Sequence, residues 1–162
     1  MKKIIVIGCP GSGKSTFSKS LHKITKIPLY HLDMLFWNAD KTTVDKSVFL
    51  DRLFKIMETS EWIIDGNYGS TMELRMQTCD TVIFLDYPLD VCLDGIQERK
   101  GKRRSDLPWI EGHEEDAEFV AFIKSYNSES RPKVIELLKQ YSHKEIHVFC
   151  DRIQAEEFLN SL

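Results

Sequence analysis

Short runs of apolar residues alternate along this chain with longer segments whose apolar residues recur at helical spacing. The runs are four to seven residues long, which is typical of strands buried on both faces of a parallel sheet. They cover residues 4–7, 27–33, 62–65, 81–86 and 145–150. Because a helical pattern separates each run from the next, the sequence predicts an α/β fold, with a parallel sheet between two layers of helices.

The helices are predicted from apolar periodicity and from residues that favour helix ends. Residues 43–58 form a helix that begins at a capping threonine, and Asp151 with Gln154 three positions later predicts the start of a last helix. Residues 117–141 form one kinked helix or two consecutive helices. The break is expected at Asn127–Pro132, because Pro132 lacks an N–H group and disfavours helical geometry before it.

The first predicted strand leads into a glycine-rich loop that continues as a helix. The loop matches the pattern G-x-x-x-x-G-K-[ST] at Gly8, Gly13, Lys14 and Ser15. Glycines let successive N–H groups turn toward one anion, and the start of the helix adds its positive dipole end. We therefore expect a nucleoside triphosphate with Mg²⁺, where Lys14 reaches the phosphates and Ser15 is a metal ligand. A glycine-rich turn with an incidental lysine is the competing interpretation. The residues expected to bind the nucleotide are Pro10, Gly11, Ser12, Gly13, Lys14, Ser15 and Thr16.

Length, composition and charge fit one globular domain over residues 1–162. A net charge of −3 and a pI near 6.0 argue against a dedicated nucleic-acid binder, so direct nucleic-acid binding is not expected. The four cysteines have no paired spacing, which indicates free thiols in a reducing compartment. No apolar segment approaches the length that crosses a membrane. We expect a cytoplasmic protein.

Two aspartates are expected at the carboxyl ends of the predicted strands, where ligands of parallel sheets collect. Asp65 ends an apolar strand, so we expect it to hold the water shell of Mg²⁺, which takes few protein ligands. Asp33 would accept a proton from the acceptor hydroxyl or orient it. For either residue the alternative is a carboxylate that caps a turn. A zinc site is not expected, because cysteine and histidine ligands are not clustered.

Other features near the strand ends have more than one interpretation. Residues 34–37 are apolar, which favours core packing over the wall of a substrate pocket. Asp86 is predicted as a helix cap before Pro88. Arg131 either points back toward the site or lies on the surface.

A basic segment lies between the fourth and fifth predicted strands. Residues 99–104 contain five cations and lead into an acidic run at residues 111–118. Such runs usually form a solvated surface. Beside a triphosphate site, a hinged basic segment can also bring cations over the transferred phosphoryl group and exclude water.

The chain resembles the adenylate-kinase-like P-loop proteins, and more closely the DNA topology modulation (FlaR-related) proteins. The residues that carry the resemblance are 8–16, 31–33, Trp37, 62–68, 84–88 and the basic segment through Asp106. The resemblance implies a three-layer P-loop fold with strand order 2-3-1-4-5, a small lid over residues of about 99–115, and ATP-dependent phosphotransfer. It also implies that Arg99 and Arg103 match two lid arginines, one that stacks on adenine and one that touches phosphate.

These resemblances leave the phosphoryl acceptor unidentified. Adenylate kinases have Asp-Gly-Phe-Pro-Arg where residues 65–68 are Asp-Gly-Asn-Tyr, and shikimate kinases have Asp-x-Asp where only Asp33 stands here. The favoured function is an ATP-dependent kinase of a small molecule or nucleotide, with Lys14, Asp33, Arg99 and Arg103 as catalytic residues. The alternative is a regulatory nucleotide-binding protein that switches a contact with DNA or with another protein.

Overall fold

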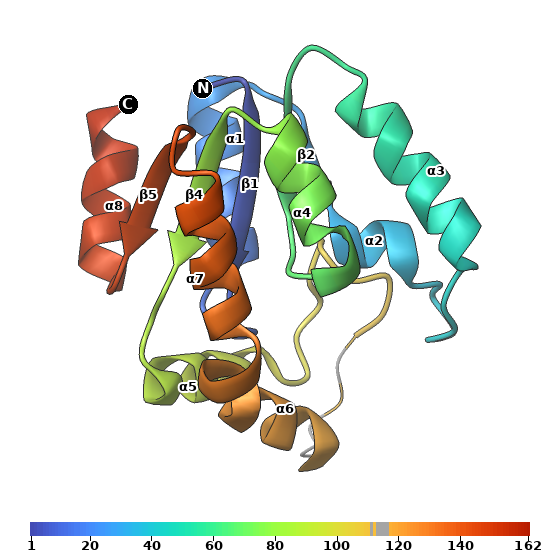
Figure 1. Cartoon of the computed structure of the whole chain (residues 1–162). Helices are drawn as coiled ribbons and strands as arrows, with labels where there is room; N and C mark the ends of the chain where they lie inside the picture. Colours follow the sequence, from blue (N-terminus) through green and yellow to red (C-terminus); the bar gives the residue numbers. More distant parts are fainter. Residues whose placement is uncertain (111, 113–116) are drawn as a thin grey trace.

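Five parallel strands form the centre of the fold in this computed structural model, which describes residues 1–110, 112 and 117–162 (Figure 1). The strands are β1 (Lys3–Gly8), β2 (Leu29–His31), β3 (Trp62–Asp65), β4 (Thr81–Leu85) and β5 (Glu145–Phe149). Their order is β2-β3-β1-β4-β5, which confirms the predicted parallel sheet and its topology. Part of the expected lid and of the acidic run lies outside the described residues.

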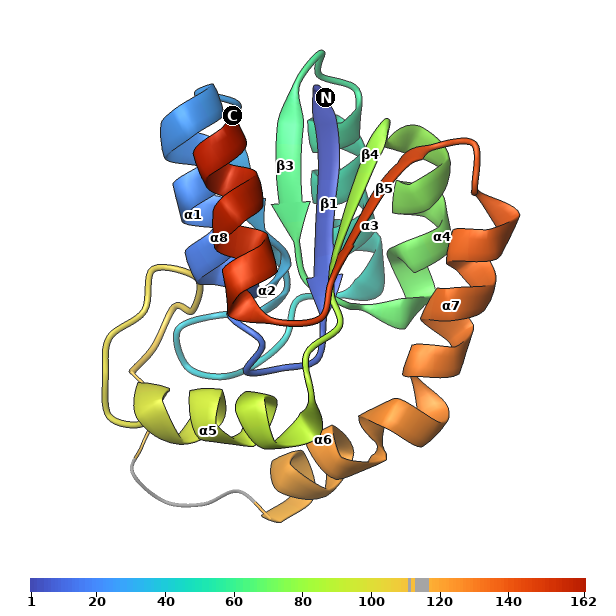
Figure 2. The same cartoon turned by 90° about the vertical axis from the view of Figure 1, so that its left-hand side faces the viewer.

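The helices cover both faces of the sheet. They are α1 (Lys14–Thr25), α2 (Leu32–Phe36), α3 (Lys46–Met57), α4 (Gly69–Thr78), α5 (Leu89–Arg99), α6 (Ala117–Glu129), α7 (Arg131–Gln140) and α8 (Arg152–Ser161). Figure 2 shows α1 and α8 on one face and α3, α4 and α7 on the other. In both views α5 and α6 lie beyond the carboxyl ends of the strands. Helices α5 and α6 therefore cover the carboxyl edge of the sheet and are separate from the two helical layers on its faces.

The central strand β1 is buried on both sides. Ile4 and Val6 pack in the hydrophobic cluster that contains side chains of α1 and α8, whereas Ile5 and Ile7 pack with α3, α4 and α7. All four side chains are fully buried. Burial of each contributes about 1.5–3 kcal/mol relative to an exposed position. Burial of the apolar run thus holds β1 in the centre of the sheet, and the glycine-rich loop begins at the end of this strand.

Two predicted boundaries differ from the structure. The second strand ends at His31, and Asp33 lies in the first turn of α2 instead of at a strand end. Helix α3 begins at Lys46, because Thr43 is engaged in an isolated antiparallel bridge with Trp37. At α3 a bridge to the end of α2 therefore shifts the helix start from the predicted position.

The break between α6 and α7 is where the sequence predicts it. Ser130 separates the two helices, and Pro132 stands in the first turn of α7. Arg131 donates two hydrogen bonds to the carboxylate of Asp86, at 2.8 and 2.7 Å. The prediction of Asp86 as a helix cap is therefore wrong: Pro88 is the N-cap of α5, and the Asp86 carboxylate is held by Arg131.

The start of α8 has the predicted capping residues in a slightly different arrangement. The side chain of Asp151 accepts a hydrogen bond from the backbone N–H of Gln154 at 2.8 Å. The side chain of Gln154 accepts from the N–H of Cys150, one residue before the N-cap. The Asp151 side chain thus satisfies an N–H group that the helix start leaves open, and Gln154 ties the preceding residue to the helix.

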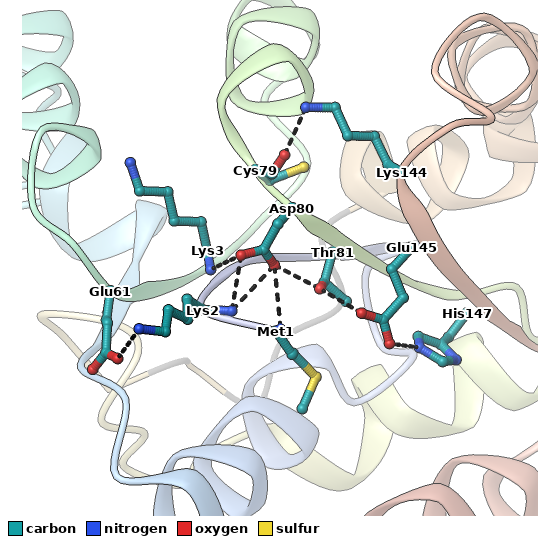
Figure 3. A network of polar contacts seen from close by, with 10 residues as sticks. All are labelled: Met1, Lys2, Lys3, Glu61, Cys79, Asp80, Thr81, Lys144, Glu145 and His147. Atoms are coloured by element: carbon teal, nitrogen blue, oxygen red, sulfur yellow. Dashed lines mark hydrogen bonds and ion pairs between the residues drawn. The ribbon is translucent and has the colours of Figure 1, made fainter.

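Asp80 organises the amino-terminal edge of the sheet (Figure 3). Its carboxylate accepts hydrogen bonds from the N–H groups of Lys2 and Lys3, at 2.9 and 3.0 Å, and from the hydroxyl of Thr81 at 2.7 Å. Partial burial alone would raise the pKa of Asp80, but these hydrogen bonds lower it below its ordinary value. This network lies at the opposite edge of the sheet from the glycine-rich loop.

The four cysteines are free thiols, as predicted, and Cys150 is the exposed one. Among the helices in the described part of the chain, none is both long and apolar enough for a membrane span.

Candidate functional site

The loop between β1 and α1 has the geometry of an anion cradle. Gly11 and Gly13 have φ angles of 84° and 90°, in the left-handed region that favours glycine. Gly13 is the N-cap of α1 and no side chain caps this end, so the first N–H groups of the helix are directed at an open site. The Nζ atom of Lys14 donates to the carbonyl oxygens of Gly8 at 2.9 Å and Cys9 at 3.2 Å, which holds the ammonium across the loop.

A cavity of about 970 Å³ opens beside this loop at the carboxyl edge of the sheet. It is lined by residues of the loop, of α4, α5, α6 and α7, and of the basic segment. The structure brings together in it Lys14, Ser15, Asp33, Asp65 and Arg99. Of the residues expected to bind the nucleotide, Ser12 does not line the cavity; it is buried, and its N–H donates to the carbonyl oxygen of Cys9.

Asp65 is buried at the end of β3, with 4% of its surface exposed. Its Oδ2 atom lies 2.7 Å from Nδ1 of His31, and since the carboxylate can only accept, the histidine donates. Burial lowers the pKa of Lys14, and the charge of Asp65 is the strongest opposing influence. Asp65 is therefore close enough to interact electrostatically with the Lys14 ammonium.

Asp33 accepts a hydrogen bond from the hydroxyl of Tyr68 at the side of the cavity formed by α2. Burial raises the pKa of the Asp33 carboxyl, although the hydrogen bond from Tyr68 and the charge of Lys14 lower it. A carboxylate with a raised pKa in a cavity is suited to accept a proton.

Two further residues support the site, and the sequence analysis did not assign them these roles. Asn67 accepts a hydrogen bond from the N–H of Gly8 at 3.1 Å and donates one to the carbonyl of the same residue. Arg75 is fully buried and donates to the carbonyl oxygens of Gly66, Asn67 and Tyr68. Burial lowers the pKa of Arg75 to about 10. In the sequence, Arg75 follows Thr71 by one helical turn and lies among methionines that are buried in α4. An arginine on an apolar helix face is the only sequence signal that could have indicated its structural role.

Helix α5 rests on the loop backbone against backbone. A Cβ atom at Gly11 would lie 2.0 Å from the carbonyl oxygen of Cys92, and one at Gly95 would lie 2.1 Å from the carbonyl oxygen of Gly11. Only glycine fits at either position. The helix that ends at Arg99 is therefore positioned directly by the loop.

The basic segment folds over the cavity. The Arg99 guanidinium lies 5.6 Å from the ring centre of Phe119 and lines the cavity. Arg104 lines it as well, whereas Arg103 is exposed, forms a bridge with Ile110 and is not among the lining residues. Trp109 packs edge to face on Trp37, with ring centres 5.4 Å apart. The segment thus contacts both the loop side and the α2 side of the cavity.

Asp106 lies two positions after the basic segment of residues 99–104 and contacts the loop. It is 5% exposed and accepts a hydrogen bond from the hydroxyl of Ser15 at 2.6 Å. Arg104 donates to both of its oxygens, from Nε at 2.9 Å and from Nη2 at 2.6 Å. The sequence analysis gave Asp106 no function.

Comparisons with known proteins bear on the fold. No protein-family model matches the chain. The chain is 28% identical over 140 residues to a shikimate kinase of Flavobacterium johnsoniae, a match that covers 75% of this chain and 79% of that protein. The structure is similar to a shikimate kinase of Bacteroides thetaiotaomicron (TM-score 0.58, 20% identity), over 98% of this chain and 94% of the other. It is also similar to a shikimate kinase of Aquifex aeolicus (TM-score 0.54, 19% identity), over 98% and 91%. This protein therefore has the P-loop kinase fold of the shikimate kinases, with a five-stranded parallel sheet in the order 2-3-1-4-5.

Proposed function

We propose that this protein is an ATP-dependent phosphotransferase that transfers the γ-phosphoryl group of ATP to a hydroxyl of a small molecule or nucleotide. One observation carries the proposal: a single cavity holds the Lys14 ammonium, the Ser15 hydroxyl, the Asp33 carboxylate and lid arginines. The likeness to shikimate kinases supports a small-molecule acceptor. The free thiols are compatible with a cytoplasmic location.

The residues present fit Mg·ATP. The glycine cradle and the uncapped start of α1 suit phosphate oxygens, and Ser15 and Asp65 offer the hard oxygen atoms that Mg²⁺ prefers. In the described part of the chain no three side chains of the His, Cys, Asp and Glu types come together as a metal site. Mg²⁺ keeps most of its waters and takes few protein ligands. When bound, Mg·ATP supplies the transferable phosphoryl group and the charge of the metal.

Each residue of the cavity has a role in this proposal. Residues 10, 11 and 13–16, which line the cavity, would bind the phosphates, and Lys14 would neutralise charge that develops on the transferred group. Ser15 would bind the metal and Asp65 would hold its waters. Asp33, with Tyr68 as its hydrogen-bond donor, orients the acceptor hydroxyl and accepts its proton. Arg99 and Arg104 face the transferred phosphoryl group from the lid of residues 99–115, and Arg103 would join them only after a rearrangement of the lid.

The test is phosphate transfer from radiolabelled ATP to a panel of acceptors that includes shikimate, nucleoside monophosphates and small polyols. Lys14→Ala should retain the fold by circular dichroism and lower kcat by at least about a hundredfold. Lys23→Ala, which removes an exposed lysine of the same helix, should leave kcat unchanged. Tight ATP binding without a phosphorylated product from any acceptor would contradict the proposal.

That negative result would favour the regulatory alternative and the resemblance to DNA topology modulation proteins. In this case the basic residues 99–104 would contact DNA or a protein. Retention on DNA should then fall steeply as salt rises, because each neutralised phosphate releases counterions.

A further inference from the structure

A lid carboxylate occupies the place beside the loop hydroxyl where the proposed function puts a metal ion. Asp106 is nearly fully buried, and its Oδ2 atom accepts a hydrogen bond of 2.6 Å from the hydroxyl of Ser15. The two residues are 91 positions apart in the sequence. The contact therefore exists only because the lid is folded onto the loop.

The electrostatics of this contact are unfavourable for a bare triphosphate. The Asp106 carboxyl accepts two hydrogen bonds from the Arg104 guanidinium and one from the Ser15 hydroxyl, which is the arrangement of an ionised carboxylate. Asp33 and Asp65 line the same cavity, together with cations such as Lys14. A phosphate chain that enters the loop would approach the negative charge of Asp106 beside the Ser15 hydroxyl. In a partly desolvated cavity, like charges repel more strongly than they do in water.

A cation between the two anions reverses this effect. A divalent ion carried by the nucleotide would lie next to the Ser15 hydroxyl in the proposed function, and the carboxylate that now accepts the Ser15 proton would be attracted to it. Arg104 shares the same carboxylate through two hydrogen bonds, so the metal also decides how strongly Arg104 is held at Asp106.

We propose that Asp106 makes nucleotide binding depend on the divalent cation: its carboxylate repels metal-free ATP and favours Mg·ATP. This inference rests on the proposed function, since it assumes that the loop binds ATP. Asp106 is then a positioning residue of the lid, which selects the metal-loaded form of the substrate before transfer.

The competing explanation is that Asp106 only fastens the lid to the loop through Ser15 and Arg104. The two explanations differ in a measurable way. If Asp106 has only a structural role, it stabilises the complexes with ATP and with Mg·ATP equally. If its charge discriminates between them, Asp106 changes the ratio of their affinities, which is a coupling between the metal and the residue.

The experiment measures the Kd of ATP by titration calorimetry, once with excess Mg²⁺ and once with EDTA. In the wild-type protein, Mg²⁺ should tighten binding strongly. In Asp106→Asn and in Asp106→Ser the ratio of the two Kd values should fall by roughly 5- to 150-fold, mainly because metal-free ATP binds more tightly. Asp106→Glu, which keeps the charge, should retain most of the wild-type ratio. Asp94→Asn removes an exposed carboxylate of α5 and should leave the ratio unchanged.

The outcomes separate this inference from the proposed function. If the wild-type protein binds ATP in neither condition, the proposed function fails, and this inference fails with it. If Mg·ATP binds but the neutral variants keep the wild-type ratio, or lose affinity equally in both conditions, only the role of Asp106 is overturned. Thermal melting of each variant shows whether the measured protein is folded.

Discussion

At the scale of single residues, the site contains charges that reduce the stability of the fold. Burial raises the pKa of Asp33, so the folded state binds its proton more tightly than the unfolded chain does. By linkage, this residue contributes no penalty below its unfolded pKa of about 3.9 and becomes a cost as the pH rises above it. Such a cost is typical of residues retained for chemistry.

Asp33→Asn should therefore stabilise the protein by about 1 kcal/mol near neutral pH while phosphotransfer is lost. The amide keeps an oxygen that can accept the hydrogen bond from Tyr68. Urea denaturation at several pH values checks the sign: the advantage of the variant should vanish near pH 4 and grow toward pH 7, since only the wild-type carboxyl ionises. An equal or lower stability at pH 7 would contradict this assignment.

The residues of the loop could be predicted from the sequence, because their spacing alone defines the anion cradle. Asp106 and Asn67 could not. Each meets the loop across a large separation in sequence, 91 positions for Asp106 and 59 for Asn67, and neither lies in a local pattern. These contacts depend on how the residues after α5 fold back onto the loop and on the path of the turn after β3.

At the scale of elements, the meeting of α5 with the loop joins the glycine-rich loop to the start of the basic segment. The closest approaches are between backbones: Gly95 faces the carbonyl of Gly11, and Gly11 faces that of Cys92. Helix α5 ends at Arg99, the first residue of the basic segment, so this contact fixes where that segment begins relative to the loop. Pro88 indicated the start of a helix here, but the sequence did not show that a helical glycine serves as a contact surface.

Gly95→Ala tests this contact. Alanine favours a helix interior by about 1 kcal/mol, but its Cβ would lie 2.1 Å from a backbone oxygen that cannot move without the loop. We expect the steric cost to prevail, with a net loss of about 1–2 kcal/mol in the free energy of unfolding and weaker ATP binding. Gly69→Ala is the matched control, because no atom lies within 4 Å of its Cβ position at the start of α4. The control should be neutral or stabilising by about 0.5 kcal/mol.

At the scale of the whole molecule, the two edges of the sheet have different tasks. The carboxyl edge holds the cavity, whereas the amino edge holds the network of Asp80 with the first residues of the chain and Thr81. The parallel strands could be predicted from short apolar runs separated by helical patterns, whereas their order was expected only from the resemblance to adenylate-kinase-like P-loop proteins. The amino-edge network could not be predicted, since it joins exposed termini of strands distant in sequence.

Asp80→Asn should lower the free energy of unfolding by about 1 kcal/mol, through weaker hydrogen bonds to the N–H groups of Lys2 and Lys3. The Kd of Mg·ATP should not change, because the cavity lies at the other edge. The folded-state pKa of Asp80 is lowered, so its contribution is present above about pH 4 and is lost as the pH falls through the folded value. Urea titrations of both proteins between neutral and acidic pH measure this difference. A changed nucleotide affinity would show that the two edges are coupled.

The edge-to-face contact of Trp109 with Trp37 gives the molecule an intrinsic optical probe. Two of its three tryptophans meet where the lid touches the α2 side, and the third, Trp62, is fully buried in the sheet. Indole emission depends on the neighbouring ring and on nearby water, so a change at the Trp37–Trp109 contact would alter two fluorophores against a constant background from the third. If the proposed lid moves, this emission would report its position in the unlabelled protein.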